Sequence, residues 1–206
     1  MDAYLTLKQE GRDEFTVSRS RFIGRAGPVT TEEDALAFIE GIRKSNRDAT
    51  HHAWAYILGD SRERCSDDGE PQGTAGLPIL DVMRKQKLRD AAVVVTRYFG
   101  GVKLGAGGLV RAYTRGAKIA LEAGVIITRR FYLSYHVSTG YSLSEKLQRE
   151  FGNRGYRIKE TVFLEQVTIT VLIPPEEKDS FESLIAEITA GRSILIEGKC
   201  VTENII

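Results

Sequence analysis

The part of the sequence best suited to chemistry is residues 91–121, which carry five basic side chains and no acidic one. Arg111, Arg115 and Lys118 follow a spacing that places them on one face of a helix. Such a face is suited to the phosphates of a polyanion, but it is also typical of an ordinary solvated surface. The bases that we expect to meet phosphate are Arg97, Lys103, Arg111 and Arg115.

A glycine-rich loop, residues 100–108, precedes a helix predicted over about 109–123. Glycine lets a backbone approach a ligand closely, and the free N–H groups at a helix N-terminus attract anions. The glycines expected to take part are Gly100, Gly101, Gly105, Gly107 and Gly108. The P-loop pattern is absent because Ala106 stands where its lysine belongs, and the dinucleotide fingerprint is absent too. The structural alternative is a tight strand-to-helix connection.

Asp67, Asp68 and Glu70 form an acidic turn that precedes another predicted helix. Three interpretations stay open. The carboxylates could bind a hard cation such as Mg²⁺, they could be surface acids that stabilise a turn, or they could pair with the bases of the glycine-rich segment. Their spacing does not match an EF-hand loop.

The histidines and cysteines form no recognisable catalytic or metal-binding set. His51 and His52 are adjacent, so on a strand they point to opposite faces. Cys65 and Cys200 lie far apart in the sequence, which is typical of a reducing compartment and excludes a disulfide scaffold. We therefore expect no metal and no cofactor, and a binding protein is favoured over an enzyme.

Composition describes an ordinary globular chain of 206 residues, with 42% hydrophobic and 28% charged residues. The net charge is +1, so any binding of a polyanion must come from a local cluster rather than from overall charge. No apolar run reaches the roughly 18 residues of a membrane span, and no signal peptide is evident. We expect a cytoplasmic protein with no membrane partner; the oligomeric state stays open.

The fold class is predicted to be α+β with two domains, 1–124 and 125–206, divided where a glycine-rich region gives way to one with few glycines. In the first domain, Thr30 or Thr31 is expected to cap an amphipathic helix, and Thr74 another. Its elements are predicted as strands at 14–22, 53–58, 62–66 and 91–95 and helices at 31–45, after Thr74 and at 109–123. The second domain reads β-α-β-β-α-β, the ferredoxin-like order.

Long motifs in the first domain resemble the IMPACT family. They are Ser66–Gly76 (SDDGEPQGTAG), Thr96–Tyr113 (TRYFGGVKLGAGGLVRAY) and Ala49–Tyr56 (ATHHAWAY), the last with Ala53 where the family commonly has Cys. The resemblance covers most of residues 15–124. Residues 125–206 are similar to the extra C-terminal domain of the bacterial, YigZ-type branch.

This resemblance implies a ribosomal-protein-like α/β fold for the first domain, as in domain IV of elongation factor G. It implies that the second domain looks like the last domain of that factor. It implies no established catalytic activity. Eukaryotic relatives regulate translation by binding the activator of a starvation-sensing initiation-factor kinase, through an additional N-terminal domain that this sequence does not include.

Two functions from different classes follow. The first is a non-enzymatic regulator associated with translation and the stress response, which binds RNA or the ribosome through the basic glycine-rich loop and helix. The alternative is an enzyme or binding protein for a phosphorylated small molecule, with the same loop as phosphate cradle. It ranks second because 105–108 lacks the hydroxyl residues that a kinase-like loop is expected to carry.

The acidic turn and the glycine-rich loop are predicted to lie side by side, because loops at strand ends commonly gather into one site. The carboxylates of Asp67, Asp68 and Glu70 should then face Lys103 or Arg97. On that hypothesis, neutralising Asp68 and Glu70 should modestly strengthen the binding of a polyanion.

Overall fold

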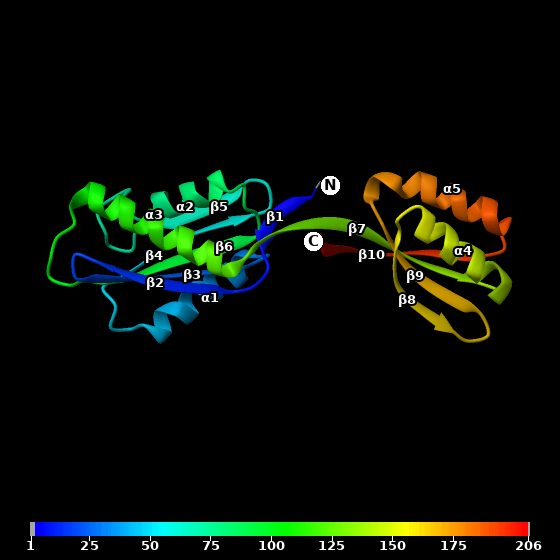
Figure 1. Cartoon of the computed structure of the whole chain (residues 1–206), viewed down its shortest axis with the longest axis horizontal. Coiled ribbons are helices and arrows are strands. Elements are labelled where there is room, and N and C mark those ends of the chain that lie inside the picture. Colours follow the sequence, from blue (N-terminus) through cyan, green and yellow to red (C-terminus); the bar gives the residue numbers. More distant parts are fainter. Residues whose placement is uncertain (1–2, 206) are drawn as a thin grey trace. The chain divides into compact units, whose positions relative to one another are not determined.

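The computed structural model describes residues 3–205. The chain is α+β and divides into two units, Tyr4–Thr128 and Arg129–Ile205 (Figure 1). The first unit contains β1 (Tyr4–Leu7), β2 (Gly11–Val17), β3 (Ser20–Pro28), α1 (Glu32–Ser45), β4 (His51–Leu58), β5 (Arg62–Ser66), α2 (Gly76–Lys85), β6 (Ala91–Tyr98) and α3 (Gly105–Gly124).

A five-stranded sheet in the order β2-β3-β6-β4-β5 forms the middle layer of the first unit, and its pairings are antiparallel. The helices α2 and α3 pack on one face and α1 on the other (Figure 1). Both faces of β6 are therefore buried. Val93 and Val95 belong to the core under α2 and α3, whereas Ala92 and Val94 belong to the core under α1. This explains the continuous apolar run from which the strand was predicted.

The N-terminus of α1 confirms the predicted cap. The hydroxyl of Thr31 accepts a hydrogen bond from the backbone N–H of Asp34, and the Asp34 carboxylate accepts one from the backbone N–H of Thr31. This reciprocal pair is a capping box, and it satisfies N–H groups that the first turn leaves without partners.

The single strand predicted over 14–22 is wrong, because the structure forms the β2–β3 hairpin there. The chain reverses at Ser18 and Arg19, whose φ angles are 46° and 63°. Two left-handed residues in succession fit the right-handed twist of a two-residue hairpin. The sequence gives little sign of this turn, because neither position is the Gly, Asn or Asp that usually marks one.

The second unit has the predicted β-α-β-β-α-β order. It comprises β7 (Ile126–Thr139, from Arg129 onward), α4 (Tyr141–Asn153), β8 (Arg157–Phe163), β9 (Val167–Ile173), the short 3₁₀ helix η1 (Pro175–Glu177), α5 (Lys178–Thr189) and β10 (Ile194–Ile205). Its strands are ordered β10-β7-β9-β8. The core under α4 and α5 contains an aromatic cluster in which the Phe181 ring contacts Tyr135, Phe151 and Tyr156. No helix within residues 3–205 is long and apolar enough to cross a membrane.

Candidate functional site

A pocket of about 420 Å³ lies in the first unit, where the start of β4, the acidic turn, the end of β6 and the N-terminus of α3 meet. The antiparallel register of β4 and β6 places His51, at the start of β4, opposite Arg97, near the end of β6. The loops next to both residues therefore lie at the same end of these strands. We call this the glycine-loop pocket. Its lining residues are Thr50, His51, Glu70, Pro71, Arg97, Phe99, Lys103, Leu104, Gly105, Ala106 and Leu109.

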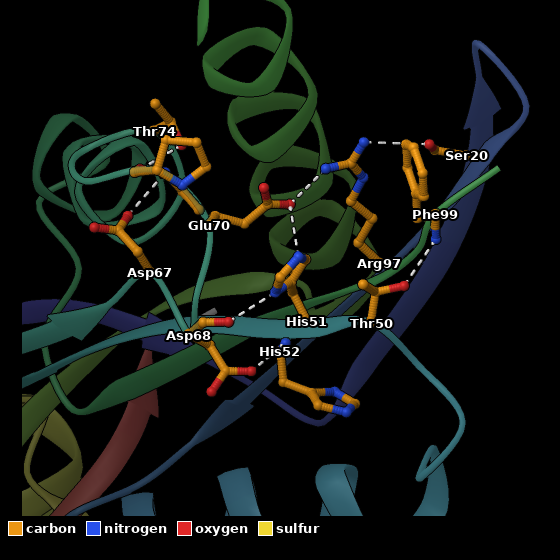
Figure 2. A network of polar contacts seen from close by, with 12 residues as sticks. Ser20, Thr50, His51, His52, Asp67, Asp68, Glu70, Thr74, Arg97 and Phe99 are labelled. Atoms are coloured by element: carbon orange, nitrogen blue, oxygen red, sulfur yellow. Dashed lines mark hydrogen bonds and ion pairs between the residues drawn. The ribbon is translucent and has the colours of Figure 1, made fainter. Parts of the chain in front are cut away.

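A buried ion pair forms one wall of the pocket (Figure 2). Arg97 Nη1 donates to Glu70 Oε1 at 2.7 Å, and the two side chains are 6% and 3% exposed. The Tyr113 hydroxyl donates to the same oxygen at 2.8 Å. Burial, together with the Glu70 carboxylate, raises the pKa of Tyr113, so its hydroxyl keeps its proton and stays a donor. Glu70 Oε1 thus accepts from two buried donors at once.

The predicted pairing of the acidic turn with the basic segment is therefore confirmed for Glu70 and Arg97. It is wrong for the other two acids. Asp68 accepts from Arg43 Nη2 at 2.8 Å and from the backbone N–H of His52 at 2.6 Å. Lys103 forms no ion pair with any residue from 3 to 205, so its charge is not neutralised internally.

Asp67 caps α2, and the prediction that Thr74 does so is wrong. The Asp67 carboxylate accepts from the backbone N–H groups of Gly73, Ala75 and Gly76 at 2.8, 3.0 and 2.8 Å. Burial works to raise the pKa of Asp67, but these three hydrogen bonds outweigh it and lower that pKa. The Thr74 hydroxyl instead donates to the carbonyl of Pro71 at 2.6 Å. The acidic turn is thus a rigid structural element of the site.

His51 belongs to the pocket, although the sequence offered no role for it. Its Nδ1 lies 2.8 Å from the carbonyl oxygen of Asp68, and its Nε2 lies 4.0 Å from Glu70 Oε1 (Figure 2). The adjacent His52 points away, as the strand geometry predicts, and its Nδ1 contacts Thr96 Oγ1 at 3.1 Å. Burial lowers the pKa of His52, with the nearby Asp68 carboxylate opposing this effect.

Phe99, Tyr113 and Ser20 were also missed. The Ser20 hydroxyl accepts from Arg97 Nη2 at 3.4 Å and from the backbone N–H of Gly100 at 3.3 Å. Phe99 is 46% exposed and lines the pocket. The register of β3 against β6 brings Ser20 to Arg97, and the packing of α3 on the sheet brings Tyr113 to Glu70. Neither register nor packing is visible in a single sequence. One sequence feature could have indicated a role for His51. It stands just before the apolar residues of a predicted strand, so it lies at the strand end where functional loops commonly gather.

The glycine-rich loop serves conformation and close packing. A Cβ on Gly100 would lie 1.9 Å from the carbonyl oxygen of Arg19 in the β2–β3 turn, so a side chain is excluded there. Gly101 and Gly105 have φ angles of 83° and 69°, which favour glycine. Helix α3 begins at Gly105, earlier than the predicted 109, so Gly107 and Gly108 belong to its first turn.

The N-terminus of α3 has neither a side-chain cap nor an acidic residue in its first turn. Its first N–H groups therefore face the pocket edge without a partner from the helix itself, and the positive end of a long helix dipole lies there. Gly105 and Ala106 line the pocket at this point. The geometry is suited to an anion, and phosphate binding at this point stays a prediction.

Exposed bases continue from the pocket along α3. Lys103, Arg111 and Arg115 line a second hollow of about 370 Å³ beside Phe15. The Arg115 guanidinium lies 4.2 Å from the centre of the Phe15 ring, a cation–π contact that leaves its charge unneutralised. We call Lys103, Arg111, Arg115 and Lys118 the α3 basic row; all four are exposed. Within the part of the chain that the structure describes, no group of three His, Cys, Asp or Glu side chains is arranged to hold a metal ion.

Comparison with known proteins defines the class first. Residues 18–121 match the Impact N-terminal domain, and residues 137–192 match a domain of unknown function, DUF1949. This pairing defines a two-domain α+β protein with an Impact domain followed by a smaller one. A solved crystal structure, described as that of a hypothetical protein, superimposes with a TM-score of 0.66 and 28% identity, covering 97% of this chain and 98% of that one.

Bacterial relatives then give the family. The chain is 38% identical over 201 residues to the IMPACT family member YvyE of Bacillus subtilis (strain 168), covering 97% of this chain and 93% of that protein. It is 32% identical over 179 residues to the IMPACT family member YigZ of Escherichia coli (strain K12), covering 85% and 88%. The chain belongs to the IMPACT family, in its bacterial YigZ-type branch.

Proposed function

We propose that this protein is a non-enzymatic, translation-associated regulator in the cytoplasm that binds RNA, free or in the ribosome, through the α3 basic row and the glycine-loop pocket. The observation that carries the proposal is the α3 basic row itself. Its four exposed cations, Lys103, Arg111, Arg115 and Lys118, have no carboxylate partner within residues 3–205. Cations left unpaired in this way are available to phosphates.

The sequence motifs imply a likeness of the two domains to domain IV and the last domain of elongation factor G, and this expectation supports the proposal of a ribosomal or RNA partner. Arg97 takes a different part from the one first expected for it. Because it is buried against Glu70, it does not present a free guanidinium to phosphate but shapes the wall of the pocket. In this proposal the contacts to phosphate come from the α3 basic row and from the N–H groups of Gly105 and Ala106.

The test is co-sedimentation of the full chain with ribosomes and with total RNA, at low and at moderate salt. Arg111→Glu with Arg115→Glu should strongly weaken binding at low salt, because four units of charge change on one helix face. The matched control is Lys44→Glu with Arg47→Glu, which changes overall charge equally at exposed positions in and just after α1, on the other face of the sheet. Absence of binding at low salt, or equal binding by both variants, contradicts the proposal.

The volume of the glycine-loop pocket favours one alternative, a phosphorylated small molecule as ligand. A space of about 420 Å³ that is lined by Lys103, His51 and the N-terminus of α3 is large enough for a compound of that class. A thermal-shift screen with nucleotides and sugar phosphates separates the two functions. A shift of several degrees with one compound class, in a protein that binds no RNA, selects this alternative.

A further inference from the structure

Hydrogen-bond acceptors line the glycine-loop pocket in addition to its cationic groups. A fully ionised anion has no hydrogen to donate to these acceptors, so it would leave them without a partner. Nδ1 of His51 lies 2.8 Å from the carbonyl oxygen of Asp68. A carbonyl only accepts, so Nδ1 donates to it, and in the tautomer with the proton on Nδ1 the other nitrogen, Nε2, presents a lone pair. That Nε2 is 4.0 Å from the nearest Glu70 oxygen, too far for a hydrogen bond.

Glu70 supplies the second acceptor. Its two hydrogen bonds, from Arg97 and Tyr113, both end on Oε1. Within residues 3–205 nothing donates to Oε2, although the side chain is only 3% exposed and lines the pocket. This carboxylate oxygen borders the pocket and accepts no hydrogen bond from the described residues, so it is open to a donor from a ligand. Nε2 of His51 and Oε2 of Glu70 therefore both offer acceptor positions to a ligand that has hydroxyl or amino hydrogens.

Donors line the same pocket. The ammonium of Lys103 and the uncapped N-terminus of α3 at Gly105 and Ala106 favour an anionic group. The pocket lining thus combines donors suited to an anion with hydrogen-bond acceptors. A simple phosphate ion satisfies only the first.

An exposed aromatic ring completes the set. Phe99 is 46% exposed and lines the pocket, with the Arg97 guanidinium 5.3 Å from its ring centre. The backbone N–H of Phe99 donates to Thr50 Oγ1 at 3.0 Å, which fixes the residue at the edge of the pocket (Figure 2). A fixed and exposed phenyl ring is a platform on which a flat heterocycle can stack.

We propose that the glycine-loop pocket binds one ribonucleotide unit of a single-stranded RNA. Its phosphate meets Lys103 and the α3 N-terminus, its base stacks on Phe99, and its 2′-hydroxyl donates to Nε2 of His51, next to Glu70. Only a ribose carries the 2′-hydroxyl, so the pocket distinguishes RNA from DNA. The inference rests on the proposed RNA-binding function and adds the selection of the sugar.

The test compares a short single-stranded RNA, the DNA of the same sequence and the 2′-O-methyl RNA, by fluorescence anisotropy with the full chain. The protein should bind the RNA about tenfold more tightly than the other two, the loss expected when a hydrogen bond to a charged group is removed. His51→Phe keeps a flat ring but removes the acceptor, so the preference for RNA over DNA should shrink. The matched control is His136→Phe in the second unit, which should keep the full preference.

Phe99→Leu provides a second variant, because His51→Phe could disturb the Asp68 loop. It should weaken RNA and DNA binding equally, since stacking does not depend on the sugar. Equal affinity of the unmodified protein for RNA and DNA overturns the inference while leaving RNA binding intact. So does a full preference that persists in His51→Phe, provided that circular dichroism shows the variant to be folded.

Mononucleotides separate this inference from the proposed function. In a titration followed by amide NMR, AMP should shift the signals of Gly105, Ala106 and His51, and dAMP should do so at about tenfold higher concentration. That result supports the pocket even if ribosome and RNA co-sedimentation fail, in which case the proposed function falls and the nucleotide site stands. Identical titrations with AMP and dAMP overturn the inference.

Discussion

At the scale of single residues, Glu70 links the acidic turn, β6 and α3. One of its oxygens accepts from both Arg97 and Tyr113, so three elements meet at a single buried atom. A buried ion pair of this kind adds little net stability, but removal of one partner leaves the other charge uncompensated. Neutralising Asp68 and Glu70, which the sequence suggested would free the bases, is therefore expected to disturb the turn instead.

Glu70→Gln should lower the free energy of unfolding by about 3 kcal/mol, because the Arg97 guanidinium stays buried without its counter-charge. Urea denaturation at neutral pH measures the change. The matched control is Glu63→Gln, which breaks the exposed pair with Arg84 and should cost at most about 1 kcal/mol. A loss for Glu70→Gln no larger than that of the control would mean that the pair is not structurally important.

His52 gives a pH dependence. Burial lowers its pKa in the folded state below the unfolded value of about 6.5. Because the folded state holds the His52 proton less tightly than the unfolded chain does, acid favours unfolding. The free energy of unfolding therefore keeps its full value above about pH 6.5 and decreases as pH falls from there towards the pKa of the folded state. Urea denaturation at about pH 7.5 and about pH 5 gives the change in the free energy of unfolding with pH, and His52→Gln should make that change smaller. His136→Gln should leave it unchanged, and a slope that survives in His52→Gln contradicts the assignment.

At the scale of elements, the packing of α3 on the sheet depends on glycine. A Cβ on Gly24 of β3 would lie 2.2 Å from the carbonyl oxygen of Gly116 in α3, so helix and strand backbones are nearly in contact. This contact sets how deeply α3 sits on the sheet. It therefore also sets where the N-terminus of α3 meets the glycine-loop pocket.

Gly24→Ala should destabilise the protein by about 2 kcal/mol, because the added methyl group meets backbone that can move only if the whole helix shifts. Gly41→Ala is the matched control: Gly41 lies in α1 with no atom within 4 Å of an added Cβ. There the same change should stabilise by about 0.5–1 kcal/mol, since alanine is the better helix former. Thermal unfolding of both variants measures the difference, and equal effects would show that α3 is free to adjust.

The elements that the sequence predicts well are those in which one signal dominates. β6 has an unbroken apolar run, α1 has a cap and an amphipathic period, and the second unit has regular alternation. The β2–β3 turn was missed because Ser18 and Arg19 adopt left-handed backbone with no residue that marks it. The start of α3 was placed too late because glycines at 105, 107 and 108 disfavour a helix locally, and tertiary packing overrides that preference.

The candidate site was predicted only in outline. The meeting of the acidic turn with Arg97 follows from a general property of loops at strand ends. Its details depend on burial, which decides that Glu70 pairs with Arg97 and that Lys103 stays free. The roles of His51 and Phe99 depend on the register of β4 and β6, which no local pattern in the sequence encodes.

At the scale of the whole molecule, the charge is balanced, with 29 basic and 28 acidic residues. Attraction to a polyanion therefore depends on where the charges are unpaired rather than on their sum. Salt bridges neutralise many of the other arginines, among them Arg43, Arg84 and Arg89. In the proposed function, the α3 basic row, which has no carboxylate partner among the described residues, provides the face for RNA.

Binding of single-stranded RNA should therefore weaken as salt increases. The steepness of this dependence should be set by the α3 basic row alone. Arg111→Glu with Arg115→Glu should reduce the slope of log affinity against log salt by about 1.4, since each lost phosphate contact accounts for about 0.7. Lys44→Glu with Arg47→Glu should leave the slope unchanged. A titration series over a range of salt concentrations measures both, and an equal reduction in both variants would show that overall charge is the cause.

The contact between Gly100 and the carbonyl oxygen of Arg19 has a practical consequence for engineering. The β2–β3 turn is short and sits between strands, which makes it an obvious place to insert an epitope tag or a fluorophore. Because this turn packs against the loop that leads into α3, an insertion there would displace that loop and distort the glycine-loop pocket. The turn at Gly59, where no atom lies within 4 Å of an added Cβ, is the better position for a reporter.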